Sequence, residues 1–117
     1  MANTFRLTTE SGITSSLENI YTVPSSTTTI VLGIMLTNTT TSTVNASVQI
    51  VSTTATSENS GGENANESVY LVKDVPIHSS SSLEIMSGNK IVLQTTDILK
   101  ASATAGCDIL VSYMEIT

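Results

Sequence analysis

Apolar and polar residues alternate with a period of two along much of the chain. The clearest example is the segment 43–53, where Val44, Ala46, Val48 and Ile50 fall on one side and the residues between them are mostly polar. A strand with one face in a core and the other in water has this pattern. The segment is therefore predicted to be a half-buried β-strand.

Two longer segments are apolar on both sides. Residues 27–36 form the most hydrophobic stretch of the chain. Residues 108–117 place Leu110, Met114 and Ile116 on one face, and Ile109, Val111 and Tyr113 on the other. A strand that is apolar on both faces is either central in a sandwich or buried in a contact between subunits.

Shorter runs at 68–77, 81–86, 91–94 and 98–103 complete the pattern, with turn residues such as 87–90 and 104–106 between them. Short strands with a turn signal about every 8–12 residues are typical of sandwiches and barrels. We therefore predict an all-β fold: a compact antiparallel sandwich or jelly-roll-like barrel of about eight strands, in a single domain over residues 1–117. Its predicted core residues are Ile34, Val48, Leu71, Leu93 and Val111.

Local signals refine this prediction. The polar link 37–42 between the strands at 27–36 and 43–53 indicates an antiparallel hairpin. Gly33 indicates either a bulge or a close approach of backbone, or merely a gap opposite a larger neighbour. Pro76 cannot donate to a strand ladder, so it is expected near a strand end or on a sheet edge.

The charge balance narrows the class of partner. The net charge is −6, and the four basic residues are scattered along the sequence. Binding to nucleic acid or to an anionic membrane would need a basic face, so neither is expected. With 39% hydrophobic and 12% charged residues, the chain is also expected to fold. The longest apolar run, 30–36, is too short to span a membrane, and no signal peptide is apparent, which predicts a protein kept on the cytosolic side or assembled there.

Little in the sequence indicates catalysis or cofactor binding. Cys107 is the single cysteine and is expected to be a small buried hydrophobe, and His78, the single histidine, is expected in a solvent-facing loop. No zinc site, nucleotide-binding motif or catalytic nucleophile motif is present, so we expect neither an enzyme nor a cofactor. The acidic segment 55–67 is expected to be a mobile, solvated loop, which leaves calcium or glycan binding open.

Several segments together resemble a known group of proteins. They are 20–24 (IYTVP), the strand 30–36 with the link 38–40, the run 69–77 (VYLVKDVPI), 88–93 (GNKIVL) and the closing 111–117 (VSYMEIT). This order is similar to small virion structural proteins of tailed phages, especially those of marine and cyanobacterial hosts. The resemblance implies a non-enzymatic virion component assembled in the host cytoplasm, and it carries over no catalytic residue.

Within that group we expect a capsid decoration, or cement, protein on the shell surface. It would be a homo-oligomer, a trimer being favoured, and its partner would be the major capsid protein. A neck, collar or tail accessory protein is the alternative, with neck or tail proteins as partners, and a carbohydrate-binding β-sandwich on a fibre is another. The expected subunit contacts combine the segment 1–9, as an arm that reaches a neighbour, with the two-faced strands: Phe5, Leu7, Ile30, Met35, Tyr113 and Met114.

Overall fold

The computed structural model describes residues 2–52, 67–86 and 88–117, and these residues form nine β-strands and no helix. The strands are β1 (Asn3–Ile13), β2 (Glu18–Thr22), β3 (Thr28–Asn38), β4 (Val44–Val51), β5 (Ser68–Ile77), β6 (Ser82–Glu84), β7 (Ile91–Leu93), β8 (Ile98–Ala103) and β9 (Cys107–Ile116). The expected acidic loop 55–67, with its open question of calcium or glycan binding, lies outside the described residues except for Glu67.

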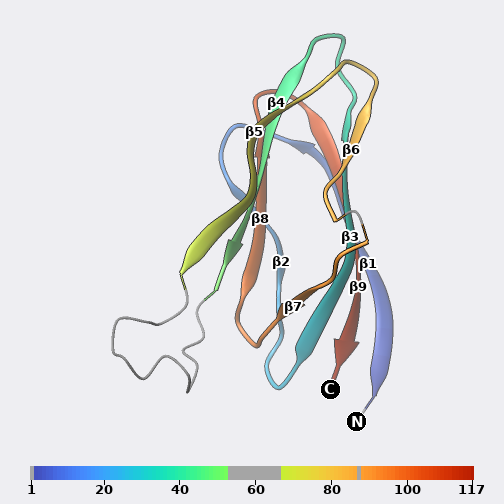
Figure 1. Ribbon diagram of the computed structural model, residues 1–117, viewed down its shortest axis with the longest axis vertical. Coiled ribbons are helices and arrows are strands. Elements are labelled where there is room, and N and C mark those ends of the chain that lie inside the picture. The colour runs from blue at the N-terminus through green and yellow to red at the C-terminus, as the bar shows by residue number, and fades with distance from the viewer. Residues whose placement is uncertain (1, 53–66, 87) are drawn as a thin grey trace.

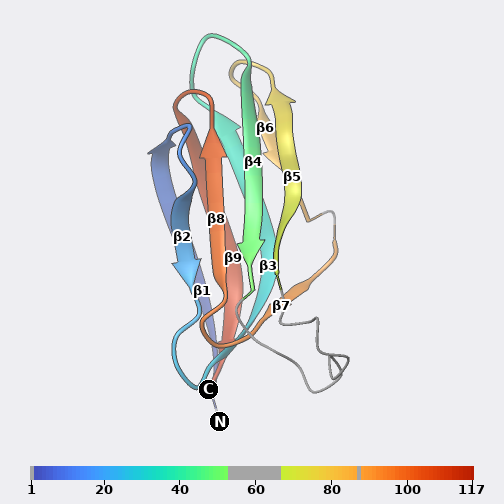
Figure 2. The ribbon, with the colours of Figure 1, turned by 90° about the vertical axis from the view of Figure 1, so that its left-hand side faces the viewer.

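The strands form two antiparallel sheets packed face to face (Figures 1 and 2). The five-stranded sheet has the order β1-β9-β3-β6, and β7 also pairs with β3. The four-stranded sheet has the order β2-β8-β4-β5. The predicted all-β antiparallel sandwich is confirmed, with nine strands where about eight were expected.

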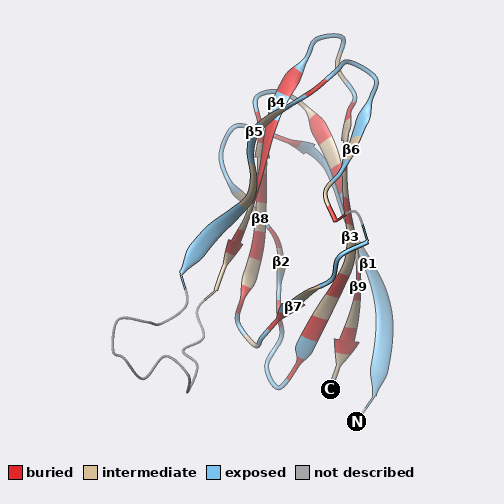
Figure 3. Ribbon diagram, in the orientation of Figure 1, coloured by how far each residue is buried: buried red, intermediate tan, exposed pale blue. Residues whose placement is uncertain are grey.

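The core lies between the sheets, and residues along the long strands alternate between buried and less buried (Figure 3). The five-stranded sheet contributes Ile34, Leu36 and Val111, and the four-stranded sheet contributes Val48 and Leu99, all at most 1% exposed. Four of the five predicted core residues are buried; the fifth, Leu71, is partly buried and packs against the others. Because aromatic residues are few, the core consists chiefly of aliphatic side chains, which suit a pleated surface.

The hairpin predicted from 27–36 and 43–53 is wrong. β3 pairs with β9, β6 and β7, whereas β4 belongs to the other sheet, so the link between them crosses from layer to layer. Each of the two strands buries its apolar face against the opposite sheet. Asn38 secures the crossing: its fully buried amide nitrogen donates to the carbonyl oxygens of Ser42 (2.8 Å), Ile77 (2.9 Å) and His78 (3.1 Å).

Gly33 lies at a bulge and Pro76 lies near the end of an edge strand, as predicted. The pairing of β3 with β9 shifts register between Val31 and Gly33, which confirms the bulge. The alternative of a close backbone approach is wrong, because a Cβ atom at Gly33 would have no atom within 4 Å. Pro76 lies near the end of β5, an edge strand, where a missing backbone donor costs little.

The segment expected as an N-terminal arm pairs within its own chain. Residues 3–9 are part of β1, which runs antiparallel to β9 in unbroken register from Asn3↔Ile116 to Glu10↔Ile109. Nearly all of β1 is exposed, and only Ile13 at its end is buried (Figure 3). The strand therefore lies at the rim of the sandwich and adds little to its core.

Candidate interaction surface

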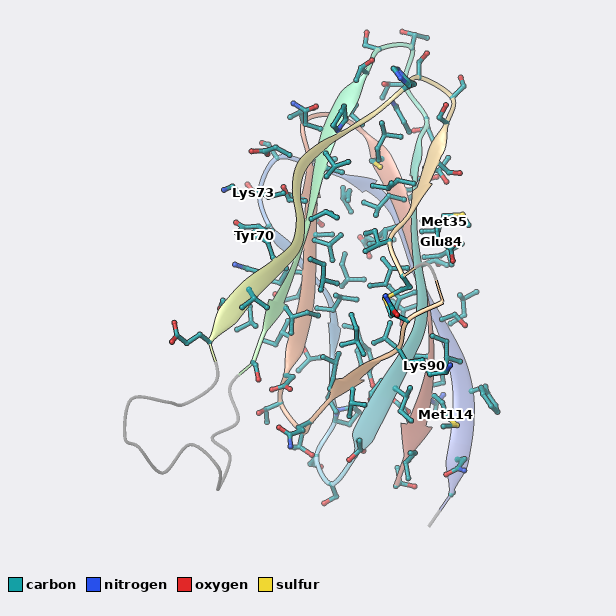
Figure 4. The ribbon with its side chains drawn as sticks, viewed as in Figure 1. Met35, Tyr70, Lys73, Glu84, Lys90 and Met114 are labelled. Carbon is teal, nitrogen blue, oxygen red and sulfur yellow. The ribbon has the colours of Figure 1, made fainter. Side chains whose placement is uncertain are left out.

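The five-stranded sheet carries a row of apolar side chains on the face turned away from the core. Phe5 on β1 is opposite Met114 on β9, Met114 is opposite Ile30 on β3, and Ile30 is opposite Val92 on β7. Because directly opposite residues of paired strands project from the same face, these four side chains cross the sheet as one line. Figure 4 shows Met114 and Met35 pointing away from the other sheet.

Neighbouring positions widen this row into a patch. Leu7 lies two residues beyond Phe5 on β1, and Leu110 on β9 is opposite Met35 on β3. Phe5 is 72% exposed, Leu7 62%, Val92 60% and Leu110 37%. We call the eight apolar residues of this face the outer patch: Phe5, Leu7, Ile30, Met35, Val92, Leu110, Met114 and Ile116.

The corresponding face of the four-stranded sheet is mostly polar, although Val51 on β4 lies opposite Ile98 on β8 near one end. Its row across four strands runs from Asn19 on β2 through Lys100 on β8 and Gln49 on β4 to Tyr70 on β5. Lys73 on β5 lies over the Tyr70 ring, with 4.8 Å from Nζ to the ring centroid (Figure 4). The two outer faces thus differ in chemistry, and apolar area exposed to water marks a contact surface.

One end of the outer patch is acidic. A hollow there is lined by residues of β1, β3 and β9, among them Asp108, Met35 and Leu110. Glu84 on β6 is opposite Met35 and points to the same side (Figure 4). The face therefore combines an apolar centre with carboxylates at one end, which would match a partner with basic groups at the corresponding position.

A buried polar cluster attaches β1 to the sandwich. Glu115, 7% exposed, accepts a hydrogen bond from Arg6 Nε at its Oε1 (2.7 Å) and from the Tyr21 hydroxyl at its Oε2 (2.5 Å). Since the Tyr21 hydroxyl has one proton, the Thr29 hydroxyl donates to it, across 2.8 Å. The Tyr113 ring lies 4.3 Å from the Tyr21 ring, centroid to centroid.

The cluster is built to hold a charge, not to transfer a proton. The hydrogen bond from Tyr21 and the ion pair with Arg6 lower the pKa of Glu115. Burial, together with the hydrogen bond to Glu115, raises the pKa of Tyr21. A paired carboxylate of low pKa beside a phenol of high pKa gives neither a base nor an acid suited to neutral pH.

The structure brings together five of the six predicted contact residues. Phe5, Leu7, Ile30, Met35 and Met114 all lie in the outer patch. Tyr113 does not: it is 4% exposed and faces the interior, so its assignment to a subunit contact is corrected. Residues of one strand alternate between faces, and Tyr113 has the opposite parity to Met114. Three residues of the patch were missed: Val92, Leu110 and Ile116. The place of Val92 in the row depends on β7 pairing with β3.

The structure also places the single histidine and the single cysteine. His78 is in an exposed loop, and Cys107 is fully buried, as expected for both; burial raises the pKa of the Cys107 thiol. No group of three or more His, Cys, Asp or Glu side chains gathers as a metal site within residues 2–52, 67–86 and 88–117. The same residues contain no helix of the length and hydrophobicity that crossing a bilayer requires.

No protein-family profile matches the sequence, and no curated protein sequence matches it. Among solved structures, the chain is similar to a protein of Bacillus endospore appendages, described as a novel family of disulfide-linked pili. The TM-score is 0.50 and the sequence identity 15%, over 99% of this chain and 87% of that chain. This similarity shows a shared fold.

A second solved structure, a chain of the T13 IBDV viral particle, aligns with a TM-score of 0.48 and 7% identity. The alignment covers 97% of this chain and 35% of that chain, so this chain spans about a third of the viral protein.

Proposed function

We propose that this chain is a non-enzymatic structural subunit of a virion and docks on its particle through the outer patch. The observation that carries the proposal is the apolar row Phe5–Met114–Ile30–Val92 across one exposed sheet face. Fully burying a side chain of the size of Val or Phe contributes about 1.5–3 kcal/mol, so a few such residues at the centre of a contact can sustain it.

The finer part of the proposal is that the particle is a phage capsid and that the chain decorates its shell. The sequence resemblance to small virion proteins of tailed phages supports this location. A sandwich that offers one broad apolar face suits the covering of a seam between shell subunits, where area buried across the boundary stabilises both neighbours. The acidic end of the face, with Glu84 and Asp108, predicts basic groups on the major capsid protein.

The linkage described for the Bacillus appendage protein does not suit this chain. A subunit that is linked by disulfides to two neighbours needs at least two cysteines, whereas this sequence has Cys107 alone. Cys107 is also fully buried, out of reach of a neighbour's thiol. Non-covalent packing of sheet faces is therefore the mode of assembly that we propose.

A carbohydrate-binding role is less well supported. Sugar sites commonly use aromatic side chains as stacking platforms. The two exposed aromatic residues, Phe5 and Tyr70, project from opposite faces of the sandwich, so they offer no joint platform.

Docking can be tested by co-sedimentation with empty shells of the phage that encodes the chain. Val92→Lys places a charge in the apolar row, far from β1, and should reduce binding at least about tenfold. Tyr70→Lys adds the same charge to the opposite face and should bind as the parent does. Equal binding by both variants would contradict docking through the outer patch, and binding to necks or tails but not shells would move the chain to those structures.

A further inference from the structure

The four sheet edges differ in how they resist pairing with another strand. β2 is five residues long and its pairing with β8 shifts register, while β6 and β7 have three residues each. β5 contains Pro76, and Asp74 within it has a φ of 53°. Short strands, irregular pairing and proline are devices that block edge-to-edge association.

β1 has none of these devices over its first eight residues. From Asn3 to Glu10 its pairing with β9 is continuous, and the segment contains no proline and no residue of positive φ. No strand within the described residues pairs with its other side. This edge is therefore a regular template that a further strand can join.

The pairing pattern fixes which backbone groups face the open edge. Ala2 and Thr117 exchange both of their backbone hydrogen bonds, at 3.1 and 2.9 Å. In an antiparallel pair such residues alternate with residues whose N–H and C=O groups point the other way. Phe5, Leu7 and Thr9 therefore direct these groups away from β9, toward the open edge.

Two opposite charges on β1 select a register for a second copy. The Arg6 side chain is 55% exposed and uses Nε for Glu115, which leaves its terminal nitrogens for another acceptor. The Glu10 carboxylate has no hydrogen-bond or ion-pair partner in the part of the chain that the structure describes. When two β1 strands run antiparallel about a two-fold axis at Thr8, Arg6 lies opposite Glu10 of the partner subunit, and Glu10 lies opposite Arg6 of the partner subunit.

That register also satisfies the open backbone groups. Leu7 exchanges both backbone hydrogen bonds with Thr9 of the partner subunit, while Arg6 sits at a position without ladder bonds, where opposite side chains come closest. An axis at Arg6 would oppose two arginines, and an axis at Glu10 would oppose two glutamates. The axis at Thr8 is thus the one that forms both ion pairs.

We propose that two copies of this chain associate through β1 in this register and join their five-stranded sheets into one continuous sheet. The pairing places the two outer patches on one side, as a single larger contact surface. The proposed dimer does not depend on what that surface contacts. It gives a dimer, in contrast to the trimer that the sequence resemblance implies.

The test is the mass of the purified protein by light scattering, over a concentration series and without shells. We expect a dimer, and Glu10→Arg, which replaces two attractions by two repulsions, should raise the dissociation constant at least about tenfold. Glu84→Arg makes the same charge change on another strand and should leave the dimer intact. Raising the salt concentration should weaken the parent dimer, because exposed ion pairs are screened.

A second variant tests the backbone pairing. Thr9→Pro removes an N–H that points to the open edge, and it should yield a monomer whose far-UV spectrum remains that of a β-protein. A parent that is monomeric or trimeric at every concentration, or a Glu10→Arg protein that dimerises as the parent does, would overturn the inference. The Thr9→Pro monomer, which changes no charge, should still bind shells, whereas a Val92→Lys dimer should not, so failure of this proposal and failure of the proposed function are distinguishable.

Discussion

Arg6 and Glu115 form an ion pair with 2.7 Å between Nε and Oε1, although they are 109 residues apart in the sequence. The pair joins the first strand to the last. Because nearly all other side chains of β1 are exposed, this contact and the hydrogen bond between Thr8 and Tyr113 are the main side-chain attachments of residues 3–9 within the described chain. These side-chain contacts add to the backbone ladder that joins β1 to β9, and the ion pair among them requires the ionised state of Glu115.

Acid should therefore weaken the sandwich. The pKa of Glu115 is lowered in the folded chain, so the unfolded chain binds this proton more readily and stability rises with pH. The contribution is complete above the unfolded pKa of about 4.3 and is lost as the pH falls through the lower folded pKa. We expect the free energy of unfolding, measured by urea titration, to fall below about pH 4.

Glu115→Gln should lose on the order of 1 kcal/mol at pH 7 and flatten this acid dependence, because the variant has no charge to lose. The control is Glu84→Gln, which changes an exposed carboxylate that makes no contact of this kind. An unaltered pH profile in Glu115→Gln would show that the cluster does not hold β1.

The central strand β4 offers a test of register. Val48 is fully buried between the sheets, so Val48→Asp would bury a charge with no partner and should cost several kcal/mol of stability. Its neighbour Gln49 faces the polar outer side, and Gln49→Asp should cost far less. Thermal melting of the two variants checks this. Similar melting temperatures would show that the register assigned to the strand is wrong.

The thiol of Cys107 should be inert in the folded protein. It is fully buried, and burial raises its pKa, so both access and thiolate formation are suppressed. A thiol reagent should modify Cys107 only after denaturation. Rapid modification under native conditions would mean that β9 opens at this end.

The sequence was enough to predict the strands from β3 to β9 and most of the core, because a period of two reports directly which side of a strand is buried. It did not predict β1, which was expected to be an arm, or β2. Five of the six residues expected in a subunit contact lie in the outer patch, because strands that are apolar on both faces have one face left outside the core. The sequence did not show which face of 108–117 that is, so Tyr113 was expected beside Met114. It could not show that β3 and β4 lie in different sheets, because the link after Asn38 has the composition of an ordinary turn. The place of Val92 in the outer patch and the place of Glu115 in the buried cluster could not be predicted either, because each depends on pairings between strands that are distant in the sequence.

Methionine oxidation tests the outer patch most directly, because the chain carries its own reporters. Met35 and Met114 lie in the patch and are partly exposed, whereas Met86 is 3% exposed in the core. In the free protein, peroxide should convert Met35 and Met114 to sulfoxides and spare Met86. In assembled particles we expect Met35 and Met114 to be protected as well. Oxidation of both at the same rate in particles as in the free protein would contradict the proposed docking face.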